Sequence, residues 1–191
     1  MAGCIVSLYC ASMPQDESTP ATPPSDEKFP KPRPPEEPET VVKLREQIES
    51  KLTEMVDAYG VDPRGSYVFG LDSARVFVVP AWLPDEATVV RVFAITNLDV
   101  PVTPQLTAFL LEKNLDFVIG AFALDAGNKA VWFNHNLLGE FMVPDQLEAT
   151  LAAVAQTANE LDDEIKERFG GRLYAEAPSE KISPPAAPGY L

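Results

Sequence analysis

The chain has 191 residues, enough for one domain with tails, and it carries a formal net charge of −14 at pH 7 with a pI near 4.4. This acidity argues against nucleic acid or an anionic membrane as a partner, because both are bound by Lys and Arg clusters that the sequence lacks. The longest apolar run, residues 76–83, is far shorter than the roughly 18 residues that a membrane helix needs. The composition therefore indicates a soluble protein.

Both cysteines, Cys4 and Cys10, lie in a short apolar run outside the region expected to fold. They cannot form a disulfide that links two parts of the folded domain. A domain without disulfides is compatible with the reducing cytosol, so we expect a cytoplasmic location. No basic residue precedes the run, so it is not predicted to be a signal peptide. The sequence leaves open whether translation starts at Met1 or at Met13.

Proline and acidic residues dominate both ends of the chain. Residues 1–39 and 173–191 are predicted to be disordered tails, because they hold too few apolar side chains to offset the entropy cost of ordering. Residues 31–35 have the PxxP spacing of a polyproline II ligand, although a spacer or solubilising tail explains the same composition. The sequence thus predicts one folded domain, residues 40–172, and leaves the role of the tails open.

The first half of this domain begins with a predicted helix. Its apolar residues recur at helical spacing from Val41 to Tyr59, with Thr40 as the expected N-cap and Gly60 as the stop. Three runs then have the apolar and β-branched character of strands, and Pro80 and Pro84 mark an expected turn between the last two. These strands are predicted at residues 66–71, 75–79 and 89–96.

The second half contains two more helices. Thr103-Pro104 predicts the start of a short helix that Asn114 ends, because proline fits the first helical position. Two strands follow, at residues 117–124 and 129–134. A long helix then opens at Pro144 and closes on Gly170-Gly171. Its apolar residues form a heptad-like seam from Leu147 to Ile165, and its opposite face is expected to be solvated: Glu148, Asn159, Asp162, Asp163, Lys166 and Glu167.

Short loops between the strands predict mainly antiparallel pairing. The first and last helices are the only ones long enough to cover a sheet of this size, so we expect them to pack together on one face of it. The predicted fold is α+β: an antiparallel five-stranded sheet with two long helices packed on one face and a short inserted helix (αβββαββα). The opposite face of the sheet must then be exposed to solvent or covered by another part of the chain or another molecule.

The central strands are apolar on both sides, so the face away from the two helices would expose a patch larger than a soluble monomer usually leaves open. A second copy of the protein, an extended client peptide or the short helix from Thr103 could cover it. The sequence does not show which face is open. The candidate partner-binding residues are Phe77, Val79, Trp82, Phe93 and Trp132.

Three segments carry a resemblance to a known family: residues 117–125 (FVIGAFALD), residues 131–136 (VWFNHN), and the long helix with LDDEI at residues 161–165 and FGG at residues 169–171. In order and spacing, residues 40–172 resemble the YbjN-domain proteins of bacteria, particularly the actinobacterial members. That resemblance implies a sheet and helices arranged as in type III secretion chaperones. It also implies a non-enzymatic module that binds peptide or protein in a chaperone-like or regulatory role, with no catalytic residues to carry over.

The residues themselves predict no catalytic, cofactor-binding or metal-binding site. His135 has no nucleophile or carboxylate at a suitable local spacing and is expected in a turn, hydrogen-bonded to backbone. The acidic run at residues 160–164 lies on a helix, where consecutive side chains point apart, so a solvated face is preferred to a metal site. The alternative to a client-binding module is a structural or regulatory homodimer that uses the same patch or the long-helix seam. An enzyme or small-molecule sensor is a third hypothesis.

Overall fold

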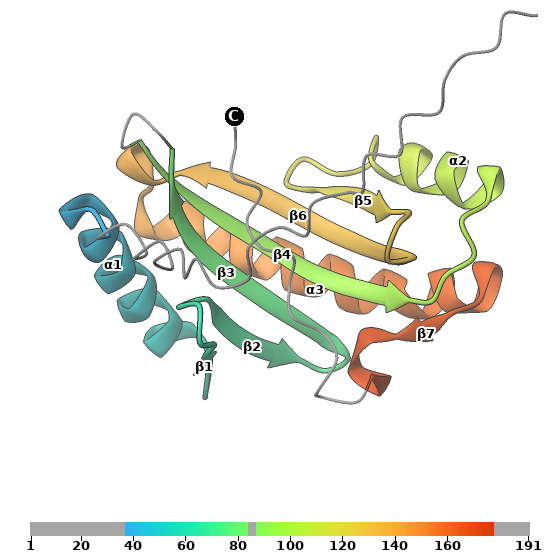
Figure 1. Cartoon of the computed structure of the whole chain (residues 1–191), viewed down its shortest axis with the longest axis horizontal. Coiled ribbons are helices and arrows are strands. Elements are labelled where there is room, and N and C mark those ends of the chain that lie inside the picture. The colour runs from blue at the N-terminus through green and yellow to red at the C-terminus, as the bar shows by residue number, and fades with distance from the viewer. Residues whose placement is uncertain (1–36, 84–86, 178–191) are drawn as a thin grey trace, which may run out of the picture. The chain divides into compact units, whose positions relative to one another are not determined.

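The structure is a computed structural model that describes residues 37–83 and 87–177 (Figure 1). The predictions for residues 1–36 and 178–191 lie outside this part of the chain. A sheet of antiparallel strands runs through the domain, in the order β1-β2-β3-β4-β6-β5, and β7 pairs with β4 off this path. Its strands are β1 (Gly60–Val61), β2 (Tyr67–Leu71), β3 (Ala74–Trp82), β4 (Thr88–Leu98), β5 (Ala121–Asp125), β6 (Ala130–Leu138) and β7 (Arg172–Leu173).

The α+β class and the antiparallel pairing are confirmed, but the sheet has seven strands among the described residues where five were predicted. The two additional strands, β1 and β7, span two residues each, which is too short for an alternating pattern to be read. β3 also runs through Pro80, which was predicted to lie in a turn. β2 pairs with β3 only as far as Val78, so β3 is an edge strand at Pro80 and tolerates a residue without an N–H there.

The helices are α1 (Glu39–Met55), α2 (Pro104–Lys113) and α3 (Pro144–Phe169). α1 begins one residue before the predicted cap, with Pro38 at the N-cap position, and it ends at Met55 because Val56 is extended. The start of α2 is as predicted, since the backbone N–H of Leu106 donates to the Thr103 side chain at 3.2 Å. Two short 3₁₀ turns complete the order: η1 (Gly139–Phe141) and η2 (Tyr174–Glu176).

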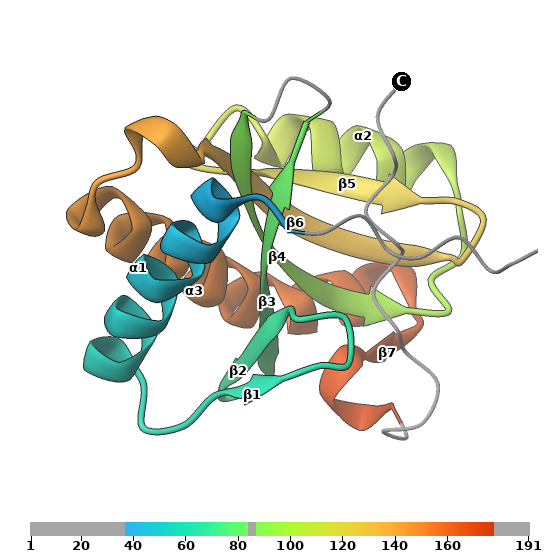
Figure 2. The ribbon, with the colours of Figure 1, turned by 60° about the vertical axis from the view of Figure 1, so that its left-hand side comes forward.

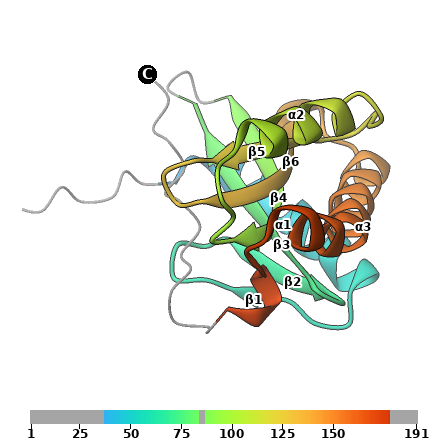
Figure 3. The same ribbon diagram turned by 90° about the vertical axis from the view of Figure 1, so that its right-hand side faces the viewer.

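All three α-helices pack on the same face of the sheet (Figures 1 and 3). α1 lies beside α3, as Figure 2 shows, and Lys51 Nζ of α1 lies 3.1 Å from Glu148 Oε2 of α3. The short helix α2 contributes Leu106, Phe109 and Leu110 to the same core. α2 therefore does not cover the second face, which was one of the three predicted covers.

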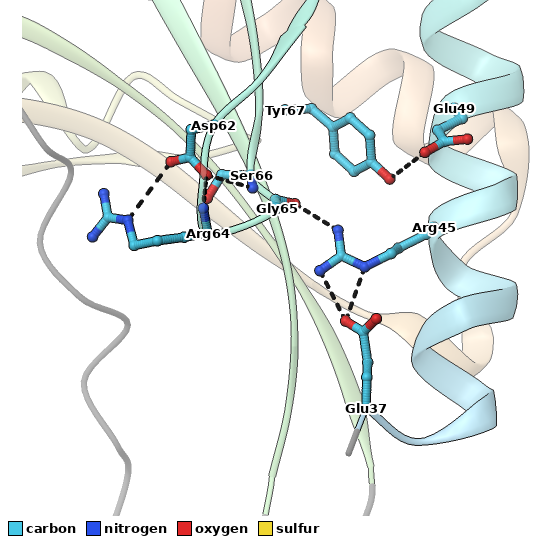
Figure 4. A network of polar contacts seen from close by, with 8 residues as sticks. All are labelled: Glu37, Arg45, Glu49, Asp62, Arg64, Gly65, Ser66 and Tyr67. Carbon is cyan, nitrogen blue, oxygen red and sulfur yellow. Dashed lines mark hydrogen bonds and ion pairs between the residues drawn. The ribbon is translucent and has the colours of Figure 1, made fainter. Parts of the chain in front are cut away.

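The seam of α3 is the centre of this core. Leu147, Val154 and Ile165 are fully buried, together with residues of α1 and the inner side of the strands. The seam packs against its own sheet and α1, so a homodimer built on the seam is ruled out by its burial. Figure 4 shows how the start of α1 is fixed: Arg45 donates to Glu37 and to the Gly65 carbonyl, and the hydroxyl of Tyr67 donates to Glu49 at 2.8 Å.

A polar network ties the turn between β2 and β3 to α3. Ser73 Oγ lies 2.8 Å from Asn159 Oδ1 and 2.6 Å from Asp162 Oδ2, while the Ser73 N–H donates to the same Asn159 oxygen at 3.1 Å. One hydroxyl proton serves only one of these two acceptors at a time. Burial raises the pKa of Asp162, and the hydrogen bond that the Ser73 hydroxyl donates to its carboxylate acts in the opposite direction. The predicted solvent exposure of Asp162 was wrong, because the turn packs over it and leaves it 1% exposed.

Candidate partner-binding face

Four of the five candidate residues lie together on the sheet face opposite the helices. Phe77 and Val79 come from β3, Phe93 from β4 and Trp132 from β6, and none of them belongs to the main core. Side chains alternate between the two faces of a strand, so the neighbours of these residues point to the helix side instead. We call this second cluster the aromatic face; it consists of Val68, Phe77, Val79, Phe93, Ile95, Leu98, Ala130 and Trp132.

Trp82 is the candidate that the structure does not bring into this cluster. It ends β3, pairs with Thr88, and is half-buried. By strand alternation it points to the other side from Phe77 and Val79. The predicted strand ended at residue 79, before the expected turn, so strand alternation was not applied to Trp82; the structure extends β3 to this residue.

The aromatic rings form a row across three strands. Phe77 and Phe93 are direct partners in the β3–β4 register, and their rings stack at 5.1 Å between centroids with a 12° interplanar angle. Phe93 and Trp132 are 5.0 Å apart and tilted by 37°, and the Arg91 guanidinium lies 5.8 Å from the Phe93 ring. Cross-strand aromatic pairs of this kind stabilise the sheet and form an apolar surface with a cationic edge.

Burial across the aromatic face is graded. Phe77, Phe93 and Ile95 are 4%, 2% and 1% exposed, while Val79 and Trp132 are only partly buried. Trp132 Nε1 is itself buried and has no hydrogen-bond partner among the described residues. An unsatisfied buried donor costs about 1–3 kcal/mol, so a carbonyl oxygen brought to this face would gain a hydrogen bond there. The aromatic face is thus apolar and largely buried, and it contains one buried donor without a partner among the described residues.

A segment beyond the predicted domain boundary at residue 172 packs on this face. Residues 172–177, which we call the strap, comprise β7, η2 and Ala177. The Tyr174 ring meets the Phe77 ring edge-on at 6.0 Å and 85°, and burial against the face raises the pKa of Tyr174. Sequence reasoning missed Tyr174; the available signal was an aromatic side chain three residues after Gly171 of the helix stop.

Gly170 and Gly171 give the strap its direction. Both have left-handed backbone angles, φ +81° and +85°, which L side chains rarely adopt. A Cβ on Gly171 would lie 2.6 Å from the Leu98 carbonyl oxygen, so only glycine fits there. The predicted role of the pair as a helix stop is confirmed, and the same pair turns the chain back towards β4.

The remaining polar candidates form no chemical site. His135 lies within β6, paired with Val92, and its predicted place in a turn was wrong because β6 extends to Leu138. Of the predicted acidic run, Asp162 is buried, and Glu164 pairs with Arg168 at 2.7 Å. In residues 37–83 and 87–177 no group of three or more His, Cys, Asp or Glu side chains could hold a metal ion. No helix among the described residues is long and apolar enough to cross a membrane.

Three exposed apolar side chains lie on and after α2. Leu111, Leu115 and Val118 are 63%, 86% and 99% exposed. They are separate from the aromatic face, because α2 packs on the helix side of the sheet.

A family model described as "T3SS (YopN, CesT) and YbjN peptide-binding chaperone 1" matches residues 42–177. The match spans well over half of the sequence, and the chain belongs to this family, which confirms the YbjN resemblance. No curated protein matches the sequence.

Several solved structures are similar in fold. The ExsC–ExsE complex matches with a TM-score of 0.51 and 17% identity, covering 65% of this chain and 95% of that one. The HopA1–SchA chaperone–effector complex matches at 0.50 and 10%, covering 65% and 96%. The Yersinia pestis type III secretion chaperone SycH, in complex with a stable fragment of YscM2, has 20% identity over 62% of this chain and 98% of that one, with a TM-score of 0.46. At 17% and 10% identity, the likeness to the first two structures shows a shared fold.

Proposed function

We propose that this domain is a non-catalytic peptide-binding module that holds an extended segment of a client protein on the aromatic face. Membership in a family described as peptide-binding chaperones gives the class of function. The observation that carries the placement is the row of Phe77, Phe93 and Trp132, with the free indole N–H beside it.

Binding on this face would come from apolar burial, at roughly 25 cal/mol per Å² before the cost of association. The partly buried side chains of Val79 and Trp132 are the parts of the face that a peptide would cover first. A backbone carbonyl of the peptide would accept a hydrogen bond from the Trp132 indole. The net charge of −14 favours clients with basic flanks, so binding should weaken as salt is added.

A peptide array tests this function. Overlapping segments of bacterial proteins, bound to a membrane, are incubated with the full chain, with Val79→Glu and with Leu111→Glu. Val79→Glu places a carboxylate on the aromatic face, and Leu111→Glu adds the same charge to the exposed side of α2, where Leu111 is 63% exposed. Thermal melts establish that both variants fold.

The wild-type chain should bind a subset of peptides rich in aromatic and basic residues, and Leu111→Glu should bind the same subset. Val79→Glu should lose it, because the new charge opposes apolar burial. Unchanged binding by folded Val79→Glu would contradict the placement on the aromatic face. No bound peptide at all would contradict the function.

A homodimer is the second candidate function. The observation in its favour is the exposed apolar surface of Leu111, Leu115 and Val118, since soluble monomers rarely expose large side chains in a group. A dimer that forms through this surface leaves the aromatic face open, so the two candidates are compatible. The cytoplasmic location inferred from the cysteines stays a prediction.

A further inference from the structure

The strap pairs with the edge of β4 and contacts the aromatic face. β3 pairs with β4 only up to the Val76–Ala94 pair, so the last residues of β4 have no partner on the β3 side. β7 occupies that edge: Leu173 pairs with Asn97, and Arg172 pairs with Leu98. The strap thus sits where an added strand would lie, and its next residue, Tyr174, reaches the Phe77 ring.

Tyr174 and Ala177 pack the strap against the sheet, but the side chains that form its ion pairs are exposed to solvent. No residue from Arg172 to Ala177 is fully buried, although the side chains beneath them are. The two ion pairs that fasten it, Arg172 with Asp99 and Lys166 with Glu176, are both 2.7 Å long and partly exposed. Exposed pairs of this kind contribute little to stability.

We propose that the strap is a displaceable internal ligand, and that the client peptide takes its place on β4 and Phe77. This rests on the proposed function and specifies its ligand: an extended peptide with a basic residue, then an aliphatic residue, then an aromatic one, as in Arg172-Leu-Tyr174. The basic residue would meet Asp99, the extended pair would add a strand to β4, and the aromatic ring would pack edge-on against Phe77. Because the client binds only molecules in which the strap is open, its apparent affinity equals its intrinsic affinity multiplied by the open fraction.

The probe is a fluorescent peptide of residues 170–177, which is the strap sequence preceded by Gly170 and Gly171. A second peptide replaces its tyrosine with alanine. Binding to the full chain is measured by anisotropy for wild type, for Tyr174→Ala and for Phe141→Ala. The last variant removes a ring that is 74% exposed and lies outside the aromatic face. Arg172→Ala is a milder variant, since it removes only the exposed contact with Asp99.

Tyr174→Ala should bind the probe about fivefold tighter than wild type or better, because it opens the strap, and Arg172→Ala should change affinity in the same direction. Phe141→Ala should bind like wild type, and the peptide without tyrosine should bind at least about tenfold more weakly. Amides of residues 172–177 should exchange faster with bulk water when wild type is saturated with probe. Equal affinity of wild type and both strap variants would overturn the proposal. If those variants also bind the array peptides as wild type does, the peptide-binding function itself stands.

Discussion

Two neighbouring residues of β6 point to opposite faces of the sheet, and their truncation separates folding from binding. Phe133 is fully buried in the main core, with the rings of Phe117 and Phe122 each 5.0 Å from its own. Phe133→Ala should lower the free energy of unfolding by about 3–5 kcal/mol. With a urea m-value of about 2 kcal/mol per M, the unfolding midpoint falls by roughly 2 M.

Trp132→Ala should be milder. It loses the ring contact with Phe93, about 0.5–1.5 kcal/mol beyond its apolar burial, but it also removes a buried indole N–H without an acceptor, which offsets about 1–3 kcal/mol. We expect a net loss of about 2 kcal/mol or less, together with loss of peptide binding by protein that is still folded. Urea unfolding and binding to an array-selected peptide measure both. Equal destabilisation by the two variants, or a larger loss in Trp132→Ala, would refute the assignment of the two faces.

Three further predictions concern the network of Asp162, the turn at Gly171 and the surface of α2. Burial raises the pKa of Asp162 above its unfolded value, so the stabilisation linked to its protonation is full below the unfolded pKa of about 3.9 and is lost as pH rises through the folded pKa. Asp162→Asn should remove this pH-dependent loss of stability. Parallel profiles of urea midpoint against pH for wild type and Asp162→Asn, from pH 4 to 8, would contradict the prediction. Gly171→Ala should lower the melting temperature more than Gly170→Ala, because both strain a left-handed backbone but only Gly171 meets the Leu98 carbonyl within 2.6 Å, and equal melting of the two would show that the close approach does not matter. If α2 forms a dimer, Leu111→Glu should halve the mass in solution without lowering stability, and an unchanged dimer mass on light scattering would exclude this surface.

The helices and the central strands were predictable because the spacing of their apolar residues matches the sides that are buried in the structure. The seam of α3 is buried as its spacing indicates, and the alternation in β3 and β4 assigned Phe77 and Phe93 to one side. What the pattern could not supply was the identity of the open face, since both sides of these strands are apolar. That depends on where α1, α2 and α3 pack, which is a tertiary outcome.

The errors have similar causes. Asp162 carries an acidic side chain at a helix position that the β2–β3 turn covers, and only the fold brings Ser73 to it. β1 and β7 are set by pairing with strands that were already in place, not by any pattern of their own. The strap was missed because a proline-rich composition begins just after it and drew the predicted boundary to residue 172.

The central claim, that an extended peptide binds the aromatic face, is tested most directly by the indole resonances in a ¹H–¹⁵N spectrum of the full chain. The sequence has two tryptophans, so Trp82→Phe assigns both signals. On saturation with an array-selected peptide, the chemical shift of the Trp132 indole N–H should change strongly. Aromatic side chains of the peptide would pack near the indole, and a peptide carbonyl would supply the hydrogen-bond acceptor that the described structure lacks. A spectrum in which the Trp132 signal stays in place while the peptide is bound would contradict the account.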